Sequence, residues 1–215
     1  MICGIDEAGR GPVIGPMIVC GVAVDDDSKL RELGVRDSKR LSPRRREELA
    51  EQIKKLAMVE IVEIPAEEID ALRANMSLNE IEAVKFASII DRLEPDHAYI
   101  DAADTDEERF GRMVQAHVRG PVRIVSRHRA DDTYPVVSAA SIIAKVERDR
   151  RVREIEREMG RPIGSGYCTD ETTMSFIMDW MARNKCLPPH TRQSWEPAQN
   201  IKRMEGLRRL ESFEE

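Results

Sequence analysis

The chain has 215 residues, of which 41% are hydrophobic and 34% are charged, and this composition excludes disorder over the whole length. Its 34 basic and 40 acidic residues give a formal net charge of −6. That balance excludes a protein that coats nucleic acid through bulk positive charge, although a local basic groove remains open. No apolar stretch approaches the ~20 residues of a membrane helix, and the N-terminal segment is acidic where a secretion signal is basic. We therefore expect a cytoplasmic protein.

Hydrophobic periodicity predicts the elements along the chain. Runs rich in β-branched residues indicate strands, and apolar positions three to four residues apart indicate helices. In chain order we expect strands at 2–6 and 17–24, a helix at 43–57, a strand at 59–64, a helix at 78–93, a strand at 97–101, a helix ending near 117, a strand at 122–126, a helix at 138–159 and a helix at about 171–183.

Two helix starts carry the pattern of a capping box, in which a hydroxyl and an acid three residues later each bind a backbone N–H. These are Ser77 with Glu80, and Thr105 with Glu108. Strands that come first and then alternate with helices predict an α/β fold with a mixed central sheet. We divide the chain into a catalytic domain over 1–160, a helical C-terminal part over 161–206 that packs on it, and a tail over 207–215.

Four carboxylates lie at the ends of predicted strands or just beyond them: Asp6, Glu7, Asp101 and Asp131. Ligand sites of α/β sheets form at strand ends, so these acids can converge in space. Two like charges ~4 Å apart at an effective dielectric of 20 oppose each other by about 4 kcal/mol. A divalent cation removes that penalty, and an all-oxygen cluster suits Mg²⁺ or Mn²⁺. Such clusters carry out phosphoryl chemistry.

The alternative is that each acid is a surface or capping residue. For a lone aspartate at a strand end, that role is the more frequent one. For Asp6 and Glu7, beside an apolar strand and a glycine-rich turn, the two roles are evenly balanced. The turn at 9–15 is not a dinucleotide fingerprint, because Pro12 lacks an N–H and a strand follows instead of a helix. Its glycines still let a backbone approach a sugar or a phosphate closely.

The motifs, taken together, closely resemble type 2 ribonuclease H (ribonuclease HII), in its archaeal form. The resemblance covers about residues 1–195 and is specific, because the motifs occur in the same order. They are DEAGRG (6–11), GP (15–16), DSK (37–39), YID (99–101), ADDTYP (130–135), SAASIIAK (138–145), GSGY (164–167) and RQSW (192–195).

The resemblance implies a ribonuclease-H-like layered α/β fold with a helical C-terminal part, in a monomeric protein. The implied activity is an endonuclease that hydrolyses the RNA strand of RNA–DNA hybrids and cuts 5′ of ribonucleotides embedded in duplex DNA. It implies two divalent ions, Mg²⁺ or Mn²⁺, and products with a 3′-hydroxyl and a 5′-phosphate. Its metal-binding acids map onto Asp6, Glu7, Asp101 and Asp131, and the register before Tyr-Pro selects Asp131 over Asp132, which we expect to face solvent.

The same resemblance implies a set of substrate-binding residues. The Gly-Arg-Gly turn and the GSGY tyrosine read the 2′-hydroxyl, which only RNA carries. A serine and a lysine contact a phosphate, and basic residues on the helix after Asp131 lie near the scissile strand. For Tyr167 taken alone, a place in the core is the more frequent role. The implied residues are Gly9, Arg10, Gly11, Ser38, Lys39, Lys145 and Tyr167, with Arg148 beside Lys145.

The tail carries Leu207, Leu210 and Phe213, whose spacing of three gathers them on one face of a 3₁₀-like turn. They either pack on the protein's own surface or form the short motif with which archaeal relatives bind the replication sliding clamp. The motif's leading glutamine is absent, so we expect weak binding. A rival function is another nuclease on the same fold, such as a Holliday-junction resolvase. A catalytically silent hybrid-binding module would need one of the four acids to be missing, and all four are present.

Overall fold

The computed structural model describes residues 1–35 and 41–211, and the side chains of 1–35 and 41–204. Its five-stranded sheet has the order β3-β2-β1-β4-β5. β1 pairs antiparallel with β2 and parallel with β4, and β4 pairs parallel with β5, so the predicted mixed sheet is confirmed. The strands are β1 (Ile2–Ala8), β2 (Met17–Val24), β3 (Met58–Ile64), β4 (His97–Asp101) and β5 (Arg123–Arg127).

The helices that the sequence predicted are present, with ends within about three residues of the expected ones. The short or weakly patterned helices α1 (Ser28–Glu32), α3 (Ala66–Leu72), α6 (Ala130–Thr133) and α9 (Glu196–Glu211) were not predicted. The structure has α1 (Ser28–Glu32), α2 (Pro43–Leu56), α3 (Ala66–Leu72), α4 (Leu78–Leu93), α5 (Glu107–His117), α6 (Ala130–Thr133), α7 (Pro135–Met159), α8 (Glu171–Asn184) and α9 (Glu196–Glu211).

Local hydrogen bonds explain where helices begin. Ser77 and Glu80 form the expected capping box of α4, with Glu80 accepting from the Ser77 N–H at 2.7 Å. The second box is wrong: Asp106, not Thr105, caps α5 by accepting from the Arg109 N–H at 2.9 Å, because the helix begins one residue later than the pattern implied. α7 begins at Pro135 instead of Ser138, since proline is well suited to a first helical turn.

Contacts within the chain define two compact units. The first unit comprises Met1–Ala8, Met17–Glu63 and Met76–Arg148, and the second comprises Gly9–Pro16, Ile64–Asn75 and Asp149–Glu215. Both units are discontinuous in sequence, and α7 contributes residues to each. The contiguous limits expected from the sequence, at 160 and 206, stay a prediction.

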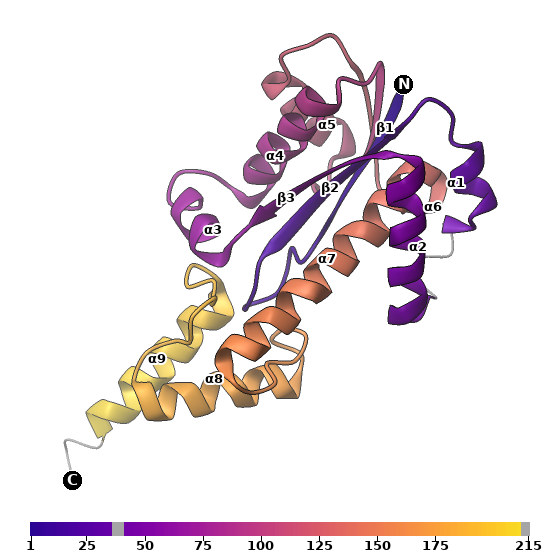
Figure 1. The fold of residues 1–215 in the computed structure, drawn as a ribbon. Helices are drawn as coiled ribbons and strands as arrows, with labels where there is room; N and C mark the ends of the chain where they lie inside the picture. Colours follow the sequence, from indigo (N-terminus) through magenta and orange to yellow (C-terminus); the bar gives the residue numbers. More distant parts are fainter. Residues whose placement is uncertain (36–40, 212–215) are drawn as a thin grey trace. The chain divides into compact units, whose positions relative to one another are not determined.

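The first unit is built in three layers around the sheet. α4 and α5 cover one face, where Phe86 and Phe110 meet edge to face with ring centroids 5.4 Å apart. α2 and the first half of α7 lie on the other face (Figure 1). They bury apolar side chains such as Leu49, Ile53 and Ile142 against β2. Both faces of the sheet are therefore covered, as its almost wholly buried strand β2 requires.

The second unit has a separate apolar core. Val13 and Ile14 of the glycine turn pack with Val152 and Ile155 of α7 and with side chains of α8 and α9, including Phe176. α9 continues as an α-helix to Glu211, so the expected 3₁₀-like turn is wrong for its first part. The side chains of Leu207 and Leu210, and all of Phe213, lie outside the described residues.

Among residues 1–35 and 41–211, no helix combines the length and the apolar character that crossing a membrane requires.

Close packing of α7 on β1 generates a test of the fold. A Cβ on Gly4 would lie 2.2 Å from the carbonyl carbon of Val136 and 2.3 Å from the nitrogen of Val137. Because both contacts are backbone atoms of α7, they cannot move aside as a flexible side chain would. We expect Gly4→Ala to lower the free energy of unfolding by about 3 kcal/mol, measured by urea denaturation. Gly120→Ala is the control, because nothing lies within 4 Å of its Cβ position; an equal loss in both variants would contradict this packing.

Candidate active site

Asp6 and Asp101 occupy equivalent places on neighbouring parallel strands. The pairing of β1 with β4 runs from Ile2↔His97 to Ile5↔Ile100, so the next residue on each strand is an aspartate. Side chains alternate between the two faces along a strand, and Gly4 and Tyr99, two residues earlier, face α7. Asp6 and Asp101 therefore project from the same face, at the carboxyl ends of their strands.

Asp131 joins them through the short helix α6. The backbone N–H of Ala130 donates to Asp101 Oδ1 at 3.1 Å, which places the residue after it beside the end of β4. Asp131 is buried, and its backbone carbonyl accepts from the Ser138 hydroxyl. Asp132 is exposed and forms an ion pair with Arg129 at 2.6 Å. The two adjacent aspartates thus have opposite surroundings, one inside and one at the surface.

The surroundings of Asp6 disfavour its ionised form. Burial raises the pKa of Asp6 well above its usual range, and the nearby charges of Glu7 and Asp101 raise it further. A hydrogen bond from Ser141 and the positive charge of Lys145 act in the opposite direction. A carboxyl group whose pKa is raised by burial and by neighbouring acids is typical of functional sites.

α7 supplies the polar groups that face Asp6. Ser141 and Lys145 lie one helical turn apart, and the Lys145 ammonium donates to the Ser141 hydroxyl at 2.8 Å. Arg148 lies almost one turn further along and is buried. Ser141 was part of a recognised motif, but its contact with Asp6 depends on the packing of α7 against β1 and had no signal in the sequence.

The donor set suits a hard divalent cation, because the acids offer only oxygen ligands. Within the part of the chain whose side chains are described, no three Asp, Glu, His or Cys side chains are gathered tightly enough to enclose an ion. Carboxylates without a counter-ion favour conformations that keep their oxygens apart. Asp6, Glu7, Asp101 and Asp131 offer such oxygen ligands, and their role in binding an ion stays a prediction.

The glycine turn (residues 9–15) lies in the second unit, where Gly9 and Gly15 adopt positive φ values of 86° and 93°. The N–H groups of Val13 and Ile14 both donate to the Gly166 carbonyl, at 2.8 and 3.2 Å. This bond pair brings the GSGY segment to the turn.

Tyr167 lies beside the turn and is 38% exposed. Its ring faces Gly11, because a Cβ on that glycine would lie 3.5 Å from Tyr167 Cε1. An exposed ring of this kind is available to a ligand, unlike a tyrosine of the core. Ser38 and Lys39 lie outside the described residues.

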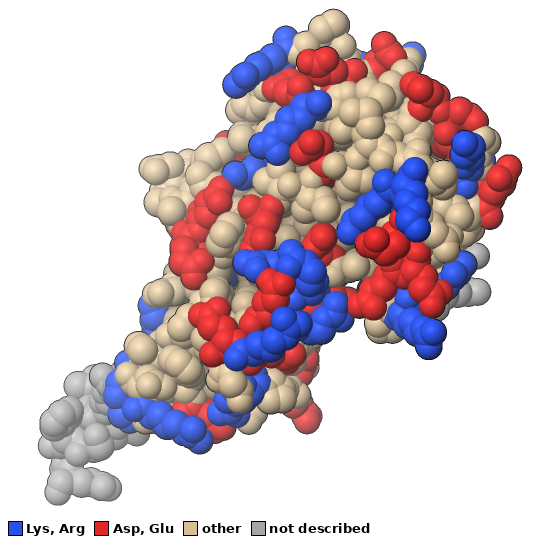
Figure 2. Space-filling model, in the orientation of Figure 1, with Lys and Arg blue, Asp and Glu red and all other residues tan. Residues whose placement is uncertain are grey.

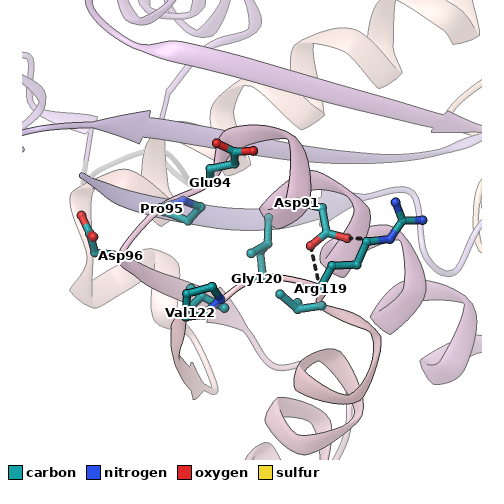
Figure 3. Close-up of a pocket in the computed structure, with 10 residues that line it drawn as sticks. Asp91, Glu94, Pro95, Asp96, Arg119, Gly120 and Val122 are labelled. Carbon is teal, nitrogen blue, oxygen red and sulfur yellow. Dashed lines mark hydrogen bonds and ion pairs between the residues drawn. The ribbon is translucent and has the colours of Figure 1, made fainter.

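A cavity of about 590 Å³ lies elsewhere in the first unit (Figure 3). It is lined by Asp91, Glu94, Asp96, Arg119 and neighbouring residues that precede β4 and β5, so it lies at the amino ends of these strands. Asp91 accepts from the Arg119 N–H at 2.9 Å, and Asp96 binds the N-terminal ammonium at 2.6 Å. Because α/β sheets bind ligands at the carboxyl ends of their strands, we do not regard this cavity as the active site.

Surface charge is mixed. On the face that Figure 2 shows, Lys and Arg side chains are interspersed with Asp and Glu side chains. Several charged side chains of the helices form ion pairs with a residue one turn away, such as Arg150 with Glu154. Attraction for a polyanion therefore depends on local positive groups and not on a continuous basic field.

Comparison with known proteins agrees with this geometry. The family model of ribonuclease HII matches residues 3–198. A ribonuclease HII of Methanococcoides burtonii is 49% identical over 209 residues, covering 93% of this chain and 98% of that protein. Ribonuclease H2 of Pyrococcus horikoshii OT3 superimposes with a TM-score of 0.88 at 36% identity, over 94% of this chain and 97% of that one. A chain in the PCNA:RNase HII complex of Archaeoglobus fulgidus gives a TM-score of 0.86 at 44% identity, over 91% and 95%.

The fold and the paired acids therefore define an enzyme of the ribonuclease-H-like α/β class, as predicted. More specifically, the chain belongs to the ribonuclease HII family, whose members are RNase H endonucleases. Enzymes of the RNase H family depend on divalent metal ions, in keeping with the all-oxygen set of acids described above.

The raised pKa of Asp6 can be tested by measuring stability against pH, without an activity assay. The folded protein binds the Asp6 proton more tightly than the unfolded chain does, so its contribution to stability is complete below the ordinary pKa of 3.8. That contribution is lost as the pH rises through the raised pKa. Asp6→Asn cannot ionise, so without divalent metal its stability relative to the wild type should increase as the pH rises above about 4. Urea denaturation in a chelator across pH measures this difference.

Asp132→Asn is the matched control, because Asp132 is exposed. Its stability should follow that of the wild type across the same pH range. If the stabilities of Asp6→Asn and the wild type change in parallel with pH, then burial and repulsion do not raise the pKa of Asp6 as described.

Proposed function

We propose that this RNase H hydrolyses the RNA strand of RNA–DNA hybrids and cuts on the 5′ side of ribonucleotides embedded in duplex DNA, leaving a 3′-hydroxyl and a 5′-phosphate. The observation that carries the proposal is the placement of Asp6 and Asp101 side by side at the carboxyl ends of β1 and β4, in a chain of the ribonuclease HII family.

In this proposal, Asp6, Glu7, Asp101 and Asp131 hold two divalent ions, Mg²⁺ or Mn²⁺. Bound there, the ions supply an activated water and stabilise the leaving oxygen. The buried surroundings of Asp6 support this role, because a cation would relieve the repulsion that raises its pKa. Lys145 lies close enough to Asp6 to act on its pKa, and we assign it to the phosphate backbone near the scissile bond.

Recognition of the ribonucleotide is assigned to the second unit. Gly9, Arg10 and Gly11 approach the sugar by their backbone, and the exposed ring of Tyr167 packs on it. The exposure of Tyr167 and its position beside Gly11 support this assignment. The 2′-hydroxyl is both a donor and an acceptor, so a fixed backbone can distinguish it from a hydrogen atom. Ser38 and Lys39 are proposed to contact a phosphate.

The opposite surroundings of Asp131 and Asp132 give the test of the proposed activity. We expect Asp131→Asn to slow cleavage of a duplex bearing a single ribonucleotide, in Mg²⁺, by more than about 100-fold, since an amide lacks the charge that holds a metal. Asp132→Asn should cut at nearly the normal rate. Mapping of the labelled products on a gel also locates the cut. Loss of activity in Asp132→Asn alone would overturn the metal-site assignment, and cleavage of branched DNA without cleavage of this duplex would favour a resolvase.

We also propose that the C-terminal tail binds the replication sliding clamp. Support comes from Leu210 and Phe213, whose spacing fits a clamp-binding motif with Leu207 in the place of the usual glutamine. Further support comes from the similar Archaeoglobus fulgidus protein, which forms a complex with PCNA.

Deletion of residues 207–215 should remove binding to the clamp of the same organism and leave cleavage of short duplexes nearly unchanged. Isothermal titration calorimetry measures the binding. Phe213→Ala should weaken it, while Ser212→Ala, the neighbouring control, should not. If the full-length protein does not bind the clamp even at high micromolar concentration, the tail has another role.

A further inference from the structure

Arg192 is an arginine with no exposed surface, although arginines are almost never fully buried unless they are paired. Its guanidinium donates to three backbone carbonyls of the glycine turn. Nη2 donates to Gly9 at 2.5 Å, Nη1 donates to Arg10 at 2.8 Å, and Nε donates to Gly15 at 3.1 Å. One planar group thus binds both ends of the turn.

Neighbouring residues extend this contact. The Arg192 N–H donates to the Val13 carbonyl at 2.8 Å, and Trp195 Nε1 donates to the Gly11 carbonyl at 3.3 Å. The Trp195 ring also stacks on the guanidinium, whose central carbon lies 5.0 Å from the ring centroid. The carbonyl oxygens of Gly9, Arg10 and Gly11 are therefore all held from the same segment, residues 192–195.

Peptide geometry determines what this does to the opposite side of the turn. The C=O and N–H of one planar trans peptide point in opposite directions. The peptide that carries the Gly9 carbonyl also carries the Arg10 N–H, and the next one carries the Arg10 carbonyl and the Gly11 N–H. Because Arg192 binds both carbonyls, both N–H groups are directed away from it. A buried positive charge behind the carbonyls also polarises these peptides and strengthens their N–H groups as donors.

We propose that Arg192 is a positioning residue for ribose recognition: it fixes the glycine turn so that the Arg10 and Gly11 N–H groups present paired donors to the 2′-oxygen of a ribonucleotide. The inference rests on the proposed reading of the 2′-hydroxyl by this turn. Stability alone does not account for the residue, since a buried charge is often replaced by apolar side chains without loss of stability. A guanidinium is needed where several carbonyls must be held in one fixed arrangement.

The test compares binding to two duplexes that differ only in the 2′-hydroxyl of one nucleotide. Fluorescence anisotropy in the presence of a chelator gives the Kd for each duplex without cleavage, and the ratio of the two values measures ribose discrimination. In Arg192→Lys, the charge stays but one ammonium cannot span the three carbonyls. We expect the ratio to fall by about tenfold, the effect of about one hydrogen bond, while the Kd for the all-DNA duplex stays within about twofold.

Arg161→Lys is the matched control. Arg161 also stacks on an aromatic ring, that of Phe176 at 5.3 Å, and also binds a partner, Asp179 at 3.0 Å, within the second unit. It has no hydrogen bond to the glycine turn among those of the described residues, so its ratio should equal that of the wild type. Trp195→Phe keeps the stacking ring and removes the donor to Gly11, so a smaller fall in the ratio is expected.

The outcomes separate the inference from the function on which it rests. If the wild type discriminates and Arg192→Lys keeps the full ratio, or binds both duplexes equally less well, the positioning role is overturned. If thermal melting shows that Arg192→Lys does not fold, Trp195→Phe decides: a lower ratio supports the role and an unchanged ratio overturns it. If the wild type itself does not discriminate, the proposed ribose recognition fails, and the role of Arg192 fails with it.

Discussion

Burial of the Asp6 carboxylate beside other acids is the constraint on which the rest of the first unit depends. Asp6 is buried beside the charges of Glu7 and Asp101, and each of these factors disfavours its ionised form. Neighbouring groups offset part of the cost. The Glu7 N–H donates to Asp6 at 2.7 Å, and Ser141 and Lys145 face it from α7. A fold selected for stability alone would not gather acids in this way, whereas a fold that binds cations needs them there.

The position of β1 in the sheet follows from the same requirement. β1 lies between β2 and β4, and its parallel pairing with β4 brings two carboxyl ends to one edge. α6 then carries Asp131 to that edge, with Arg129 in the left-handed region at φ 55° allowing the sharp entry into the helix. Each of the three aspartates thus comes from a different element, and no pair of them is close in sequence.

Much of the fold could be predicted from the sequence, because its signals are local. β2 is an apolar run rich in β-branched residues, β1 begins with a shorter run of this kind, and α4 begins at a capping box that the structure contains. The four-residue helix α6 was missed because its pattern is too short to show a period. The convergence of Asp6 with Asp101 could only be hypothesised from the residues themselves, since it depends on a register that joins residues 95 positions apart. The resemblance to a known family implies that Asp6 and Asp101 bind metal, but the strand register explains why they lie close together.

The burial of Arg192 could not be read from sequence at all, since its bond to Gly9 spans 183 residues. Because the chain is synthesised from its N-terminus, residues that are far apart in sequence emerge from the ribosome at different times. β1 and β2 emerge early and can pair as a hairpin, but β1 must wait for its other neighbour, β4. Asp101, at the end of β4, follows Asp6 by roughly ten seconds at about 10 residues per second. Until then the nascent chain exposes an unpaired apolar strand edge, the kind of surface that chaperones bind and that promotes aggregation.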